Sequence, residues 1–170
     1  LDSGTNDPGN PASYTVLTPT ITLQPATKAG YTFGGWYADA GFTTPVTQIV
    51  LGSTGNVTLY AKFTAVYPVT YNGNGSTGGS APVDALSPYA AGATVTVLGA
   101  GSLVRTGYTF VDWDMASDGS GANYDPADTF PMPGSAVTLF AQWTLDTYTI
   151  TYNLDSGTND PGNPASYTVL

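Results

Sequence analysis

The sequence predicts a mainly β protein built from tandem small modules, with little or no helix. Two observations lead to this class. The segment Leu1–Leu17 occurs again, letter for letter, as Leu154–Leu170, at an offset of 153 residues. Short runs of alternating apolar and polar residues, typical of half-buried strands, lie between clusters of turn residues. Because loop letters match as well as apolar ones, we interpret the chain as a window on a tandem array whose unit is 153 residues.

A weaker repeat divides this unit into two diverged modules. Three segments recur in the same order at spacings of 77, 80 and 81 residues, and the spacing drifts through loop insertions. The predicted organisation is a first module at 1–66 that lacks its opening strand, a complete second module at 67–147, and the opening strands of the next first module at 148–170. The three pairs are Gly30–Trp36 with Gly107–Trp113, Val57–Thr64 with Val137–Thr144, and Tyr67–Asn72 with Tyr148–Asn153.

The first module reads as a series of short strands. Ser13–Leu17 and Thr20–Leu23 alternate at period two, and the Pro19 between them implies a break or an edge. In the strand Tyr31–Tyr37, Gly34 and Gly35 favour a β-bulge that returns Trp36 to the face of Phe33. A short strand is expected at Gln48–Leu51. The alternation Val57, Leu59, Ala61 and Phe63 is the strongest strand signal of the chain.

The second module repeats this order, with strands expected around Val69, Val95, Tyr108 and Val137–Trp143. Gly or Pro interrupts almost every window of helix length, and only Ala85–Ala91 has room for one turn of helix. We expect two separate aromatic cores with few contacts between them. One should contain Phe33, Trp36, Leu59 and Phe63, and the other Phe110, Trp113, Leu139 and Trp143.

The segments that recur resemble the Listeria–Bacteroides repeat, also called the internalin B-repeat. Its elements are an opening YxVTYN strand, a Gly-rich turn, a GYTFxGW segment and a closing NVTLYAKW-like strand, found here at Tyr67–Asn72, Gly73–Gly79, Gly107–Trp113 and Ala136–Trp143. In the first module Phe63 stands where the family usually has Trp. The resemblance covers essentially the whole chain. It implies β-grasp-like modules in secreted or cell-surface proteins and brings no catalytic residues.

Composition excludes several functional classes. The net charge is −9, with three cations and no histidine, so the chain lacks the basic residues that nucleic acid needs. No apolar run approaches the roughly 20 residues of a spanning helix, and no membrane insertion is expected in this segment. The absence of His, Cys and Glu removes the usual catalytic acids, bases and nucleophiles. We therefore expect no enzyme and no cofactor, with weak Ca²⁺ binding as the exception.

That exception rests on five aspartates in one loop of the second module. Clustered carboxylates suit Ca²⁺, although their spacing is not that of an EF-hand. The alternative is that they are solvated turn residues. The candidate ligands are Asp112, Asp114, Asp118, Asp125 and Asp128.

Other motifs have ordinary alternatives. Gly73, Gly75 and Gly78 match the dinucleotide-binding spacing, but Gly79 and Pro82 prevent the helix that a phosphate site requires, so a hairpin loop is the better interpretation. Asn56 and Asn74 stand in glycosylation sequons. The three Trp residues suit either sugar stacking or core packing, and their period-two placement favours the core.

The expected function is a structural repeat of an extracellular or cell-surface protein, forming a stalk, spacer or filament body. The alternative is an adhesin module that binds glycan or a host surface protein. The expected partners are neighbouring copies, head to tail. Because the first module lacks its opening strand, its sheet should show an unpaired edge, and Tyr148–Asn153 of a neighbouring copy should complete it.

Overall fold

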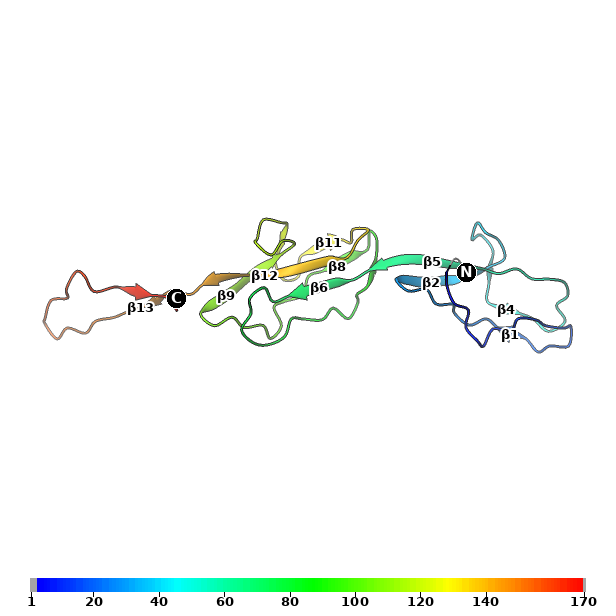
Figure 1. The fold of residues 1–170 in the computed structure, drawn as a ribbon, viewed down its shortest axis with the longest axis horizontal. Helices are drawn as coiled ribbons and strands as arrows, with labels where there is room; N and C mark the ends of the chain where they lie inside the picture. Colours follow the sequence, from blue (N-terminus) through cyan, green and yellow to red (C-terminus); the bar gives the residue numbers. More distant parts are fainter. Residues whose placement is uncertain (1–2, 170) are drawn as a thin grey trace. The chain divides into compact units, whose positions relative to one another are not determined.

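The computed structural model describes residues 3–169 (Figure 1), and within them every regular element is a strand. The absence of helix from this range confirms the mainly β prediction. The helical turn considered at Ala85–Ala91 does not form, because the strand β7 (Tyr89–Ala90) occupies its end. The chain divides into two compact units, Leu1–Tyr67 and Pro68–Leu170.

The first unit contains a sheet in which β5 pairs with β2 and β2 pairs with β3, all antiparallel. A separate pair is formed by β1 and β4, where Ile21 faces Ile49. Ser13–Leu17, expected as a strand, is not one here. The strands are β1 (Ile21–Thr22), β2 (Tyr31–Tyr37), β3 (Pro45–Val46), β4 (Gln48–Ile49) and β5 (Tyr60–Tyr67).

The second unit repeats this plan and adds a strand. Its main sheet has the order β10-β9-β12-β6, and β6 runs parallel to β12. The pair β8 and β11 corresponds to β1 and β4. The strands are β6 (Val69–Asn72), β7, β8 (Thr94–Thr96), β9 (Tyr108–Asp114), β10 (Asn123–Tyr124), β11 (Thr129–Pro131), β12 (Val137–Leu145), β13 (Tyr148–Thr149) and β14 (Ser166–Tyr167).

A β-bulge sets the face of the central tryptophan in both units. In β2 the register shifts between Phe33 and Trp36, as predicted from the two glycines, and Gly35 has φ +115°. The same shift lies between Phe110 and Trp113 in β9, where no glycine is present. The bulge therefore belongs to the module plan and does not depend on glycine.

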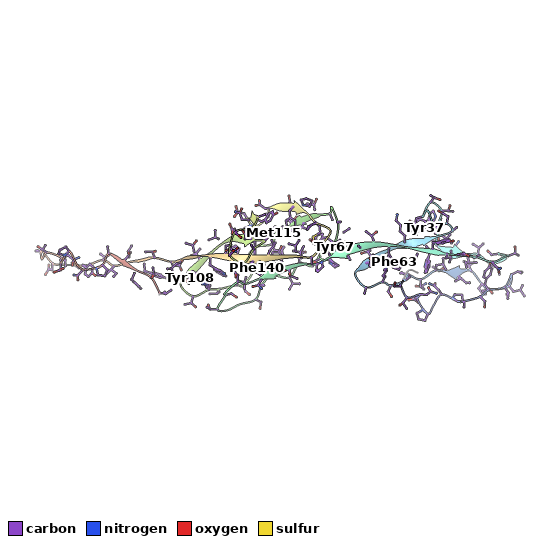
Figure 2. The ribbon with its side chains drawn as sticks, turned by 45° about the horizontal axis from the view of Figure 1, so that its top comes forward. Tyr37, Phe63, Tyr67, Tyr108, Met115 and Phe140 are labelled. Carbon is purple, nitrogen blue, oxygen red and sulfur yellow. The ribbon has the colours of Figure 1, made fainter. Side chains whose placement is uncertain are left out.

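Aromatic rings form a core in each unit, as predicted. Phe33 packs edge-on against Trp36 and Phe63, with ring centroids 5.5 and 5.8 Å apart. Phe110 contacts Trp113 and Trp143 in the same way, at 5.3 and 5.8 Å. Figure 2 labels Phe63 in the first unit and Phe140 in the second.

The two closing strands differ in length. The alternation at 57–63 predicted one strand, but in the first unit it begins at Tyr60, whereas β12 begins at Val137, the counterpart of Val57. The missing residues, 57–59, correspond to those that β12 pairs with β6. Within the described part of the first unit no strand takes the place of β6, so this stretch lacks a partner and stays outside the sheet.

Candidate functional site

An open groove of about 500 Å³ lies in the first unit beside residues 57–59. Val57 and Leu59 line one side, and the segment from Asn10 to Tyr14 lines another. Trp36 also borders the groove. Val57 is 47 % exposed, whereas its counterpart Val137 is 6 % exposed. The groove is therefore one place in this unit where an apolar side chain, Val57, remains open to solvent.

Hydrogen bonds across the groove involve the backbone of Gln24. The indole N–H of Trp36 donates to the Gln24 carbonyl over 2.8 Å, and the Gln24 N–H donates to Asn10 Oδ1 over 2.7 Å. The hydroxyl of Tyr14 donates to the carbonyl of Gly55 over 2.5 Å. These contacts join the 10–14 segment to both sides of the groove.

The second unit has the same tryptophan contact but a filled groove. Trp113 donates to the Leu98 carbonyl over 2.8 Å, as Trp36 does to Gln24. The Leu98 N–H donates to the hydroxyl of Tyr71, a residue of β6, over 3.0 Å. The ring of Tyr71 packs on Trp113 with centroids 4.8 Å apart, and both side chains are buried. The added strand β6 thus closes the core that stands open in the first unit.

The acidic loop does not bring its five aspartates together. Asp112 and Asp114 border one hollow of about 450 Å³. Asp114 is buried, and its Oδ1 accepts the N–H groups of Ala116 and Gly121 over 2.6 and 3.0 Å. Asp112 Oδ2 accepts from the side chain of Asn123 over 3.3 Å, while its buried Oδ1 has no hydrogen-bond partner.

Of the other three aspartates, Asp118 and Asp128 accept hydrogen bonds within turns. The Ser120 hydroxyl donates to Asp118 over 2.7 Å, and this bond lowers the pKa of the Asp118 carboxyl. Asp128 accepts the N–H of Asp125 over 2.9 Å. Among residues 3–169 no group of three metal-ligating acidic, His or Cys side chains comes together. The Ca²⁺ site stays a prediction, in which Asp112 and Asp114 are the pair that shares a hollow.

The two sequons differ in accessibility. Asn56 is exposed at the rim of the groove. The side-chain nitrogen of Asn74, to which a glycan would attach, donates to the carbonyls of Ser117 and Ala141 over 2.8 and 2.9 Å. Attachment there would replace one of the two amide hydrogens and so remove one of these bonds, whereas Asn56 is exposed, so Asn56 is the better acceptor of the two.

The three tryptophan side chains pack in the cores of the two units. Trp113 is fully buried, Trp36 is 7 % exposed, and Trp143 is half-buried with its indole N–H on the Gly73 carbonyl at 3.0 Å. The Gly-rich stretch that matched the dinucleotide spacing forms a loop, in which Gly78 pairs with Val104, and no helix follows it in the described residues.

Comparison with known proteins gives a consistent result. The family model described as the Listeria-Bacteroides repeat domain matches residues 2–62 and again 67–142. Two relatives come from Evansella cellulosilytica. One, a predicted membrane protein, is 39 % identical over 123 residues, which is 70 % of this chain and 18 % of the relative. The other, a predicted Gly-rich membrane protein, is 34 % identical over 148 residues, 82 % of this chain and 17 % of the relative.

The chain therefore spans less than a fifth of the length of these curated relatives. No solved structure matches it. Residues 3–169 contain no apolar helix of the length needed to cross a membrane.

Proposed function

Because the chain belongs to the Listeria-Bacteroides repeat family, we propose that it is a non-catalytic structural repeat of an extracellular or cell-surface protein, which forms a stalk or spacer. The observation that carries this proposal is the use of the aromatic residues. Trp36 and Trp113, which recur at the same place in each module, are buried in two separate cores. Modules that each have their own core add length when they are joined in series.

Two further observations support the proposal. The relatives are named as predicted membrane proteins, and the present chain matches a small part of each, as expected of a repeat within a longer surface protein. The alternative, an adhesin module for glycan or a host protein, calls for exposed aromatic rings on which a sugar stacks. The buried positions of Trp36 and Trp113 favour the spacer.

The spacer proposal is tested by varying the number of units. One, two or four copies of the 153-residue unit are placed between a cell-wall anchor and a terminal epitope, and the height of the epitope above the wall is measured by super-resolution microscopy. Folded modules in series should raise the epitope in equal steps. A Gly/Ser linker of the same residue number is the control, because the extension of a flexible chain grows only as the square root of its length. An epitope height that follows the linker would contradict the proposal.

A further inference from the structure

The loops that follow β2 and β9 each hold an equivalent residue in the left-handed conformation. The N–H of Phe42 donates to the Asp39 carbonyl over 3.2 Å, and the N–H of Gly119 donates to the Ala116 carbonyl over the same distance. Phe42 and Gly119 are 77 residues apart, which is the spacing of β2 and β9. Their φ angles are +55° and +75°. The two modules therefore place different residues at one backbone position.

Phenylalanine is an unfavourable choice at this position. Glycine adopts a positive φ freely, whereas a bulky L residue is strained by it. The Asp39 carboxylate fixes the loop by accepting the N–H groups of Thr43 and Thr44 over 3.1 and 2.8 Å. The ring is not deeply buried in return, since Phe42 is 38 % exposed. Strain that is kept at the surface, where glycine serves in the second module, points to a role in binding rather than in folding.

The Phe42 ring belongs to a small cluster on one face of the first sheet. It packs edge-on against Tyr37, which Figure 2 labels, with ring centroids 5.4 Å apart. The ammonium of Lys62 lies 5.8 and 6.0 Å from the centroids of these two rings. This is the face opposite Trp36, because neighbouring side chains of a strand point to opposite faces. We call Tyr37, Phe42 and Lys62 the aromatic knob.

The equivalent face of the second sheet is hollow where the first carries the knob. The register defines the equivalence, because Asp114 pairs with Phe140 as Tyr37 pairs with Tyr60. A hollow of about 450 Å³ opens there, and the residues at all three knob positions line it. These residues are Asp114, Gly119 and Gln142.

The hollow contains carboxylate oxygens that lack a donor. Asp112 Oδ1 is buried and has no hydrogen-bond partner among residues 3–169. Asp114 is 2 % exposed, and the two N–H groups that it accepts both bond to Oδ1. The described residues that line the hollow include no Lys or Arg. Because a buried carboxylate is costly unless it is paired, the hollow suits a positively charged hydrogen-bond donor.

The knob and the hollow are complementary in charge and in shape. Lys62 is one of three basic residues of the chain, and it is exposed beside two rings. The hollow offers two carboxylates and, at Gly119, no side chain. Complementary charge selects a partner, and exposed aromatic rings gain most from burial in a pocket. Because the chain itself carries both surfaces, a second copy supplies the partner.

We propose that the aromatic knob of one chain docks in the hollow of a second copy, with the Lys62 ammonium donating to Asp112 Oδ1 and the Phe42 ring over Gly119. The two surfaces differ, so the contact is heterologous, and a pair joined by one contact keeps a knob and a hollow for further copies. The inference goes beyond the proposed spacer function, which holds whether or not neighbouring chains adhere to one another.

The first test identifies the contact directly. The 170-residue chain is prepared as an equal mixture of unlabelled and ¹⁵N-labelled protein in calcium-free buffer, so that no metal competes for the two carboxylates. A carbodiimide, which joins an amine to a carboxylate in direct contact, is added, and the linked peptides are identified by mass spectrometry. Docking should link Lys62 to Asp112 or Asp114 in peptides of which one half is labelled and the other is not.

Lys28 is the internal reference for random collisions, and its links to the same two carboxylates should be much rarer than those of Lys62. Equal yields from Lys62 and Lys28 would overturn the proposal. Links found only within one label would overturn it as well, because they would join residues of a single chain.

The second test measures association by sedimentation equilibrium. Phe42→Gly should weaken it at least about tenfold, as loss of an aromatic anchor does. The melting temperature of this variant should stay close to that of the wild type, because glycine adopts the positive φ freely. Equal association of Phe42→Gly and the wild type would contradict the docking.

Charge reversal then tests the pairing of the two surfaces. Lys62→Asp should weaken association, and adding Asp112→Lys to it should restore association, because the opposite charges then face each other again. Lys28→Asp makes the same change in net charge outside the knob and should leave association unchanged. A folded double variant that associates as weakly as Lys62→Asp alone would contradict the assignment of the partner surface.

Discussion

At the scale of single residues, a buried tyrosine–aspartate pair holds the segment that leads into β7. Tyr89 donates to Asp84 Oδ2 over 2.6 Å, and Asp84 Oδ1 accepts the N–H of Leu86 over 2.9 Å. Both side chains are less than 10 % exposed. Burial, followed by the bond to Asp84, raises the pKa of Tyr89 to about 12. Repetition and alternation gave no sign of this pair, because its two members lie five residues apart in a loop.

This pair makes stability depend on alkaline pH. Between pH 10 and about 12 the unfolded chain loses the Tyr89 proton while the folded chain keeps it, so the free energy of unfolding falls as the pH rises through this window. Urea unfolding of the wild type at pH 9, 10 and 11.5 should show the loss. Tyr89→Phe keeps the ring, and its stability should decline less steeply over the same range; equal slopes would contradict the assignment.

Neighbouring glycines give a matched pair of substitutions. A Cβ on Gly79, which has φ +75°, would lie 1.8 Å from the Ser102 carbonyl oxygen, whereas a Cβ on Gly78 would meet nothing within 4 Å. Gly79→Ala should destabilise the second module by more than the roughly 1–2 kcal/mol of a left-handed residue. Gly78→Ala should lie within about 0.5 kcal/mol of the wild type. Thermal unfolding of the two variants measures the difference, and similar melting temperatures would argue against this loop geometry.

Calcium binding is also tested at the residue scale. Asp112 and Asp114 supply few of the six to eight oxygens that Ca²⁺ takes, so a site there would be weak. Binding at ten times the dissociation constant would add about 1.4 kcal/mol to the free energy of unfolding. We expect millimolar Ca²⁺ to raise the melting temperature of the second module and Asp112→Asn to cancel the rise. Calorimetry with no heat of binding would leave these aspartates with turn roles alone.

At the scale of elements, the sequence predicted strands well where the partner strand is present. The bulge at Gly34–Gly35 and the two aromatic cores follow from local pattern, and the structure confirms them. The predicted strand at 57–63 was wrong at its start, because alternation reports how a strand would face a core and not whether a neighbour is there to pair with it. Internal repetition supplied that second kind of information. It identified Tyr148–Asn153 as the copy of β6, although the β-grasp-like shape implied by the family resemblance stays a prediction.

Residues 57–59 have no neighbouring strand in the described structure, and this should show in the free energy of unfolding that matched core substitutions remove. Leu139 is fully buried, and Leu139→Ala should cost about 2–5 kcal/mol. Leu59, its counterpart at the groove, is half-buried, and Leu59→Ala should cost roughly half as much, in proportion to the buried area lost. In a chain that carries the sequence of Tyr148–Asn153 directly before Leu1, the two costs should become similar. Equal costs in the 170-residue chain would mean that the first core is already closed.

At the scale of the whole molecule, the two modules share one plan. Each has its own aromatic core and its own bulged central strand, while β6 is present only in the second among the described residues. In a serial array, stability is approximately the sum of the modules and of the contacts between neighbours.

Calorimetry should separate the stability of the first module from that of the second. The 170-residue chain should unfold in two transitions, and the first module should melt at the lower temperature because its core borders an open groove. Placing the sequence of Tyr148–Asn153 before Leu1 should raise that transition by roughly 4–8 °C for each kcal/mol gained. The transition of the second module should not move, since β6 already fills its sheet. Leu139→Ala assigns the transitions, because it should lower the upper one alone. A single transition unaffected by the extension would mean that the modules are neither independent nor incomplete.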